Sequence, residues 1–68
     1  MLTPQLKDKA IKVIVSNLVM AGLLDHQKVG KYMSHISTMT DFELVKQLLG
    51  SKRLLDSHYQ QLVEAWRN

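Results

Sequence analysis

The longest apolar run of the chain lies in its first third, from residue 10 to residue 24. At about 100° of rotation per residue, its apolar side chains cover more than half of the circumference of a helix. The residues that share this arc are Ala10, Ile11, Val13, Ile14, Leu18, Met20 and Ala21. A helix that is apolar on so many sides needs cover from several neighbours, either from its own chain or from a second copy. The pattern therefore predicts a central helix on which the rest of the chain packs.

Local signals place the ends of this first helix at residues 4 and 21. Threonine and proline are suited to the cap and first turn of a helix, and Thr3-Pro4 supplies both. Gly22 is the expected stop, because glycine tolerates the left-handed conformation that ends many helices. Asn17 falls inside the apolar arc. One interpretation is that it hydrogen-bonds to a neighbouring helix or lies at the edge of the core; the other is that it sets the register of a dimer, as a buried asparagine does in coiled coils.

A second helix is predicted over residues 25–36. Asp25 is placed to cap it. One face carries an i, i+3, i+4, i+7 set of apolar residues. This set consists of Val29, Tyr32, Met33 and Ile36, and the other side carries His26, Lys28, Lys31 and His35.

Two further short helices are predicted after a polar link. Thr40 and Glu43 match a capping box and begin a helix over residues 41–50, with Gly50 as its expected end. A fourth helix over residues 56–66 presents Tyr59, Leu62, Val63 and Trp66 on one face. We expect Trp66 either to close the bundle or to anchor a partner.

The chain also contains a loose internal repeat. An apolar helix, a small-residue break, Leu-Leu-Asp and a second helix occur twice, with Asp25 and Asp56 ending the two Leu-Leu-Asp segments. Duplication and convergence both explain this repeat, and in either case each half reads as an αα-hairpin. The sequence thus predicts a single all-α domain over residues 1–68, in which two antiparallel αα-hairpins of four short helices pack around the first helix. We expect this bundle to form a homodimer with Ile14, Asn17, Leu18 and Ala21 in the dimer core.

The length and composition of the chain limit its stability and the kinds of site that it can form. A chain of 68 residues buries only about 60% of the surface that it exposes when unfolded, so it is marginally stable alone. It contains no cysteine, which excludes disulfides and thiolate metal sites and fits a reducing compartment. The polar N-terminus does not read as a secretory signal, and the apolar run is too short to span a bilayer. We expect a cytoplasmic protein without a membrane partner.

No catalytic, metal or cofactor signature appears in the sequence. The chain has three histidines, and no two of them stand three or four residues apart, so no helical face offers a metal-binding pair. The isolated glycines form no phosphate-binding loop. We therefore predict a protein that is not an enzyme and has no cofactor.

Nucleic acid binding is the main alternative. The helices at 25–36 and 41–50 can be read as a helix-turn-helix, with Lys28, Lys31 and Lys46 on phosphates. This would make the chain a small DNA-binding transcriptional regulator. Asp41 and Glu43 open the reading helix and would face the phosphates unfavourably, and the net charge is only +3.

The preferred prediction is a non-enzymatic regulator or adaptor that binds, and inhibits or redirects, a larger protein. Thr40–Trp66 is similar in pattern to the helical hairpin of a sporulation-checkpoint kinase inhibitor, and Val15–Gly22 resembles a short piece of a biofilm connector. Each likeness covers under half of the chain, and neither supplies a functional residue. The predicted contact surface consists of Lys28, Lys31, Tyr32, Arg53, Tyr59 and Trp66.

Overall fold

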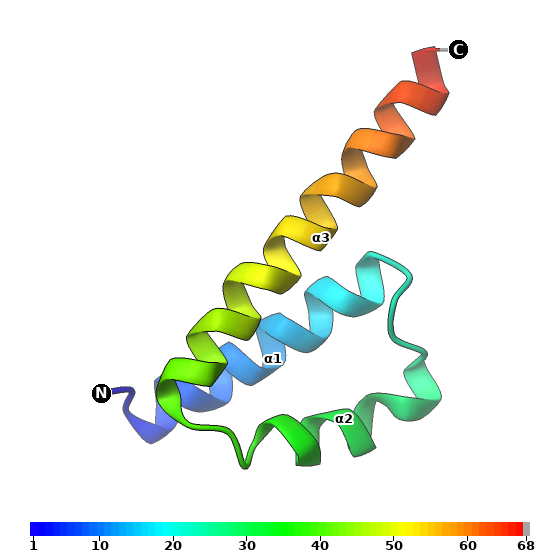
Figure 1. The fold of residues 1–68 in the computed structure, drawn as a ribbon. Helices are drawn as coiled ribbons and strands as arrows, with labels where there is room; N and C mark the ends of the chain where they lie inside the picture. Colours follow the sequence, from blue (N-terminus) through cyan, green and yellow to red (C-terminus); the bar gives the residue numbers. More distant parts are fainter. Residues whose placement is uncertain (68) are drawn as a thin grey trace.

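The computed structural model describes residues 1–67, and the elements in this range are all helical. They are α1 (Pro4–Met20), the short 3₁₀ helix η1 (His26–Lys28), α2 (Val29–Ile36) and α3 (Asp41–Arg67). Figure 1 shows that α1 and α3 start at the same end of the molecule and run side by side in the same direction, while α2 returns along α1. No strand occurs among these residues, so the predicted all-α class is confirmed.

Helix α1 has the ends that its sequence predicts. The Thr3 side chain accepts a hydrogen bond from the Leu6 N–H at 3.1 Å, and Pro4 occupies the first turn. At the other end Gly22 has a φ of 74°, and the Leu23 N–H donates to the Leu18 carbonyl at 2.9 Å. This is the closing bond of a Schellman motif, which needs a left-handed residue at the position of Gly22.

The predicted second helix is divided into two parts. Asp25 caps it, accepting from the Gln27 N–H at 3.3 Å, but the first turn is the 3₁₀ helix η1 and the α-helix begins only at Val29. A short 3₁₀ turn at the start of a helix is common. The segment then ends at Ile36, as predicted.

The prediction of four helices is wrong, because the segments 41–50 and 56–66 belong to one helix, α3. Its start is confirmed, since the Thr40 hydroxyl accepts from the Glu43 N–H at 3.2 Å. Gly50 does not end the helix. A glycine in a helix interior costs about 1 kcal/mol relative to alanine, and here the packing of α3 on α1 across that point outweighs the cost.

The continuity of α3 also removes the second predicted hairpin. Asp56 and the two leucines before it lie in mid-helix, whereas Asp25 lies at a real break between α1 and η1. The two Leu-Leu-Asp segments therefore have different structures. Within residues 1–67 the fold is three α-helices and one 3₁₀ turn, not two stacked hairpins.

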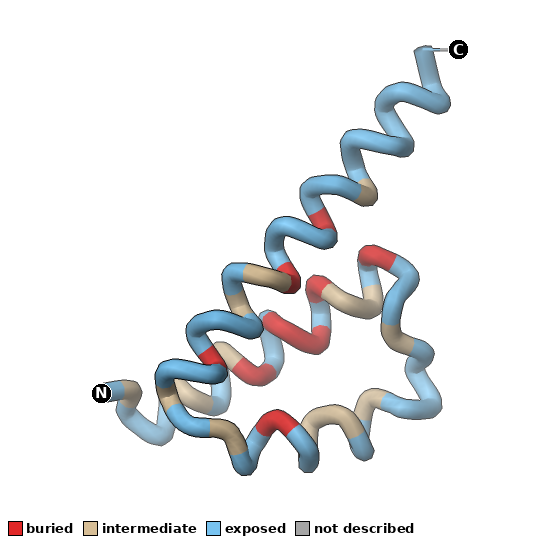
Figure 2. The backbone as a smooth tube through the Cα atoms, in the orientation of Figure 1, coloured by how far each residue is buried: buried red, intermediate tan, exposed pale blue. Residues whose placement is uncertain are grey.

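The core lies where the three helices meet, and Figure 2 shows its buried positions concentrated on α1 and on the facing side of α3. Its buried residues are Ile11, Ile14, Val15, Ile36 and Leu44. The C-terminal part of α3 extends well beyond this core, as Figures 1 and 2 show, and the long axis of the molecule measures 44 Å. A large share of α3 is consequently uncovered.

Candidate protein-docking surface on α3

Helix α3 packs on α1 through one regular stripe, which we call the inner seam. It consists of Leu44, Leu48, Ser51 and Leu55, spaced four, three and four residues apart. Leu44, Ser51 and Leu55 are buried and Leu48 is partly buried. This spacing keeps the stripe on one side of a helix, so α3 faces α1 continuously past Gly50.

A polar pair sits in the middle of the inner seam. Asn17 of α1 is 9% exposed, and its side-chain amide donates to the Ser51 hydroxyl at 3.2 Å. The Ser51 hydroxyl in turn donates to the Leu48 carbonyl at 2.9 Å. Of the two interpretations of Asn17, the hydrogen bond to a neighbouring helix of the same chain is the one observed.

A second stripe runs along α3 about a quarter turn away from the inner seam, and we call it the outer seam. Its positions alternate in spacing between three and four residues over the whole helix, which is the spacing of a coiled-coil seam. The members are Phe42, Val45, Leu49, Lys52, Asp56, Tyr59, Val63 and Trp66, and all eight are exposed. Trp66 is 89% exposed and Phe42 is 73% exposed.

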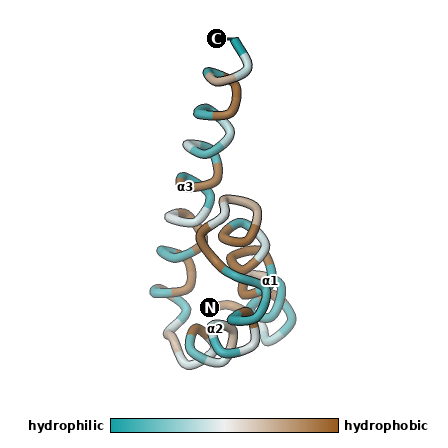
Figure 3. Tube along the Cα trace, turned by 90° about the vertical axis from the view of Figure 1, so that its right-hand side faces the viewer, coloured by the Kyte–Doolittle hydropathy of each residue, from teal (hydrophilic) through white to brown (hydrophobic). Residues whose placement is uncertain are grey.

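The last turns of α3 lie beyond the end of α1. The Tyr59 hydroxyl reaches the Met20 sulfur at 3.9 Å, at the last turn of α1. Leu62, Val63 and Trp66, which come later, are all exposed. Figure 3 shows hydrophobic segments recurring along this projecting part of the helix. Trp66 therefore does not close the bundle of a single chain.

Helix α1 contributes an apolar border to the same side of the molecule. Leu6, Val13 and Met20 follow one another at intervals of seven residues, and each is exposed. Because Met20 touches Tyr59, this stripe adjoins the outer seam. A shallow cavity of about 260 Å³ lies between the two helices, lined by Leu2, Leu6, Lys9, Ala10, Val13 and Leu48.

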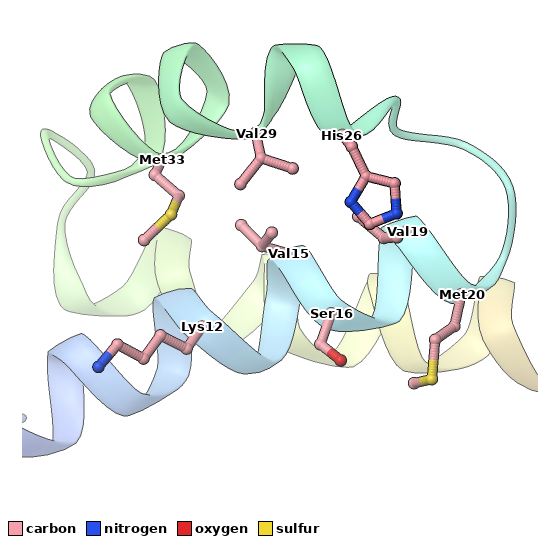
Figure 4. Close-up of a pocket in the computed structure, with 8 residues that line it drawn as sticks. All are labelled: Lys12, Val15, Ser16, Val19, Met20, His26, Val29 and Met33. Carbon is pink, nitrogen blue, oxygen red and sulfur yellow. The ribbon is translucent and has the colours of Figure 1, made fainter.

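A separate groove of about 310 Å³ lies between α1 and the segment formed by η1 and α2. Figure 4 shows Val15, Val19, Val29 and Met33 facing one another there, with His26 over Val19. Lys12 lies on the rim and is paired with Asp8 at 3.0 Å. Its polar lining residues are Lys12, Ser16 and His26, none of them is acidic, and the other lining residues are apolar, so the groove has the character of a mainly apolar contact surface.

The structure divides the predicted contact residues into two groups. Lys28, Lys31 and Tyr32 belong to η1 and α2, with both lysines exposed and Tyr32 partly buried against the core. The other group consists of Arg53, Tyr59 and Trp66, which are exposed on α3. Figure 1 shows these two regions well separated, so they do not form one surface.

The residues expected in a dimer core lie inside the single chain. Ile14 is fully buried, Ala21 is 7% exposed and Leu18 packs against the core. Asn17 is engaged with Ser51. Within a single chain α2 and α3 cover these side chains, and their place in a dimer core stays a prediction.

Four apolar members of the outer seam escaped the sequence prediction as contact residues: Phe42, Val45, Leu49 and Val63. The signal was present, because the alternating spacing runs unbroken from residue 42 to residue 66. A helix break assumed at Gly50 divides the stripe into two short pieces, so its period over residues 42–66 is lost.

The side chains suited to catalysis are dispersed. His26, His35 and His58 lie on η1, α2 and α3 respectively. Within residues 1–67 no three histidine or acidic side chains are grouped so that they could hold a metal ion. In the same range no helix is both long enough and apolar enough to cross a membrane.

Comparisons with protein-family models, with curated proteins and with solved structures found no match to this chain.

Proposed function

We propose that this chain is a small non-enzymatic regulator that acts by binding a larger protein, which it inhibits or redirects. The observation that supports this most directly is the outer seam of α3, where six apolar side chains are exposed along one stripe. Exposed apolar patches mark interaction sites. Tryptophan, tyrosine and phenylalanine, all present here, are enriched at protein interfaces.

The charge pattern favours a protein over a nucleic acid. Lys52 and Asp56 lie together in the outer seam, so the stripe carries both signs. Lys46, a proposed phosphate contact of the helix-turn-helix alternative, lies 5.4 Å from the centre of the Phe42 ring in a cation–π contact. Asp41 at the start of α3 accepts a hydrogen bond from the Leu2 N–H at 2.9 Å, which keeps a negative charge at the end that would read bases.

Affinity capture with three variants tests the proposal. We expect the wild-type chain to retain one defined protein, and we expect Trp66→Ala or Lys31→Glu to weaken that binding by more than about tenfold, because a few anchors dominate interface energies. Gln61→Ala is the matched control, since Gln61 is exposed on the opposite side of α3 from the outer seam.

The alternative function, DNA binding, can be tested with the same variants. Retention on heparin and a shift of duplex DNA, both lost at modest salt and both abolished by Lys31→Glu, would support a DNA-binding regulator and contradict the proposal. A cytoplasmic location stays a prediction from the absence of cysteine.

A further inference from the structure

The outer seam is complementary to itself when it is read in the reverse direction about residue 54. Phe42 then corresponds to Trp66, Val45 to Val63 and Leu49 to Tyr59. The two charged members, Lys52 and Asp56, correspond to each other. Antiparallel coiled coils pair positions in this manner, because each layer joins a position of one helix to the complementary position of the reversed helix.

We propose that a second copy of this chain occupies the outer seam, with the two α3 helices packed antiparallel as a two-stranded coiled coil. The aromatic pair of Phe42 and Trp66 closes each end. Two layers of Val45 with Val63 and two of Leu49 with Tyr59 form its apolar body. This inference goes beyond the proposed function, because it assigns the outer seam to a second copy, and a larger protein then has to bind the remaining surface of η1 and α2.

Charge decides the direction of the pairing. In the antiparallel register each Lys52 lies beside Asp56 of the other copy, which gives two opposite-charge contacts at the centre. In a parallel register Lys52 would face Lys52 and Asp56 would face Asp56, and like charges across such a seam repel. The seam thus favours one orientation of a second copy.

The size of the seam suits a stable dimer. Its 24-residue span corresponds to about 36 Å of helix, and all eight positions are exposed in the single chain. A standard interface buries about 800 Å² per partner, and each large aromatic side chain buries about 150–250 Å². Three aromatic and three aliphatic residues, with the adjoining α1 stripe, supply an area of that order.

The cavity beside the seam fits the same arrangement. It lies between α1 and the first turns of α3, and Leu2, Leu6 and Leu48 are among its lining residues. In the antiparallel register the last turns of the second α3 run along these first turns. The cavity then offers apolar room beside the Trp66 end of the second copy.

Disulfide cross-linking tests the register directly, because the natural chain contains no cysteine. We expect the double variant Val45→Cys/Val63→Cys to form a covalent dimer under mild oxidation. Each single variant should stay uncross-linked, since two copies of residue 45 lie about 27 Å apart along the antiparallel pair. Cross-linking of the single variants would overturn the proposed orientation.

Gln47→Cys/Gln61→Cys is the matched control. These two exposed positions have the same axial spacing about residue 54, but they lie on the opposite side of α3. Covalent dimer from the control in the same yield as from Val45→Cys/Val63→Cys would mean that collision, not pairing, produces the cross-link, and it would overturn the proposal.

Charge reversal provides a second, non-covalent test by sedimentation. Lys52→Asp or Asp56→Lys alone should raise the dimer dissociation constant about tenfold or more. The combined exchange Lys52→Asp/Asp56→Lys should restore it, because the opposite-charge contacts return in the antiparallel dimer only. Failure of the double exchange to restore dimerisation contradicts the register.

The two proposals fail in different ways. A wild-type chain that sediments as a monomer at high concentration, yet retains another protein through Trp66, overturns the second copy and leaves the regulator. A chain that forms the cross-linked dimer but retains no other protein overturns the regulator and leaves the second copy. If both hold, Lys31→Glu should leave the dimer intact while weakening capture, because Lys31 lies on α2 away from the paired helices.

Discussion

At the scale of residues, the contact between Asn17 and Ser51 determines how α3 sits on α1. An asparagine in an apolar arc is costly unless its amide finds a partner. Ser51 is that partner at 3.2 Å, and it lies 34 positions away in the sequence. No buried side-chain nitrogen or oxygen atom within residues 1–67 lacks a hydrogen bond. The pair therefore selects one sliding position of the two helices, which apolar contacts alone would leave less well defined.

Replacing Asn17 by alanine should lower the free energy of unfolding by about 1–2 kcal/mol, through the lost hydrogen bond and the space left at the helix contact. Urea unfolding followed by circular dichroism measures this change. Ser16→Ala is the control at an exposed neighbouring position, where we expect a change within about 0.5 kcal/mol. Equal midpoints for the two variants would show that the buried amide contributes nothing to stability.

The apolar core provides a second test of stability. Ile14 is fully buried between the helices, and Ile14→Val should cost about 0.5–1.5 kcal/mol while leaving the fold intact. Val13→Ala, one residue earlier at an exposed position, should cost clearly less in the same urea titration. A larger loss of stability for Val13→Ala than for Ile14→Val would contradict the burial of Ile14 in the core.

At the scale of elements, the decisive feature is that α3 continues through Gly50. Gly22 and Gly50 both follow an apolar helical segment, so the local sequence predicts the end of a helix at each of them. Gly22 adopts a φ of 74° and ends α1, whereas Gly50 is helical. The difference between the two glycines comes from the inner seam. After Gly50, the α3 residues Ser51 and Leu55 continue to pack against α1. After Gly22 the chain has no further helix surface in register and turns back into η1.

Alanine substitutions at the two glycines should change the free energy of unfolding in opposite directions. A Cβ at position 50 meets nothing within 4 Å, so Gly50→Ala should raise the free energy of unfolding by about 0.5–1 kcal/mol through higher helix propensity. Gly22→Ala should lower it, because alanine is strained at positive φ. Thermal or urea unfolding of both variants provides the comparison. A destabilised Gly50→Ala would indicate a break in α3 at that position.

At the scale of the whole molecule, a short chain leaves one long helix more than half uncovered. The core has five buried residues among those that the structure describes and is small; its largest fully buried side chains are Ile14, Ile36 and Leu44. Small domains of this size commonly gain stability by oligomerisation. The antiparallel pairing of α3 would cover the outer seam of both copies and bring two cores into one assembly. The surface of η1 and α2 would remain free on each copy for a larger protein.

The stability of such an assembly depends on its concentration. Binding of a second copy stabilises the folded state by mass action, so the urea midpoint of the wild-type chain should rise steadily as its concentration is raised over two orders of magnitude. Leu49→Asp places an uncompensated charge in the outer seam and should abolish this dependence. A wild-type midpoint that does not change with concentration argues against the dimer.

The sequence by itself determined the helical class, the ends of α1 and the start of α3. These features depend on residues close together in the chain, such as Thr3 with Leu6, Thr40 with Glu43, and Gly22 at the end of its helix. Tertiary structure alone decided that Gly50 continues a helix, that Asn17 bonds to Ser51, and that Ile14 and Ala21 are buried within one chain. Such outcomes depend on which surfaces meet, and local propensities differ by too little energy to settle that.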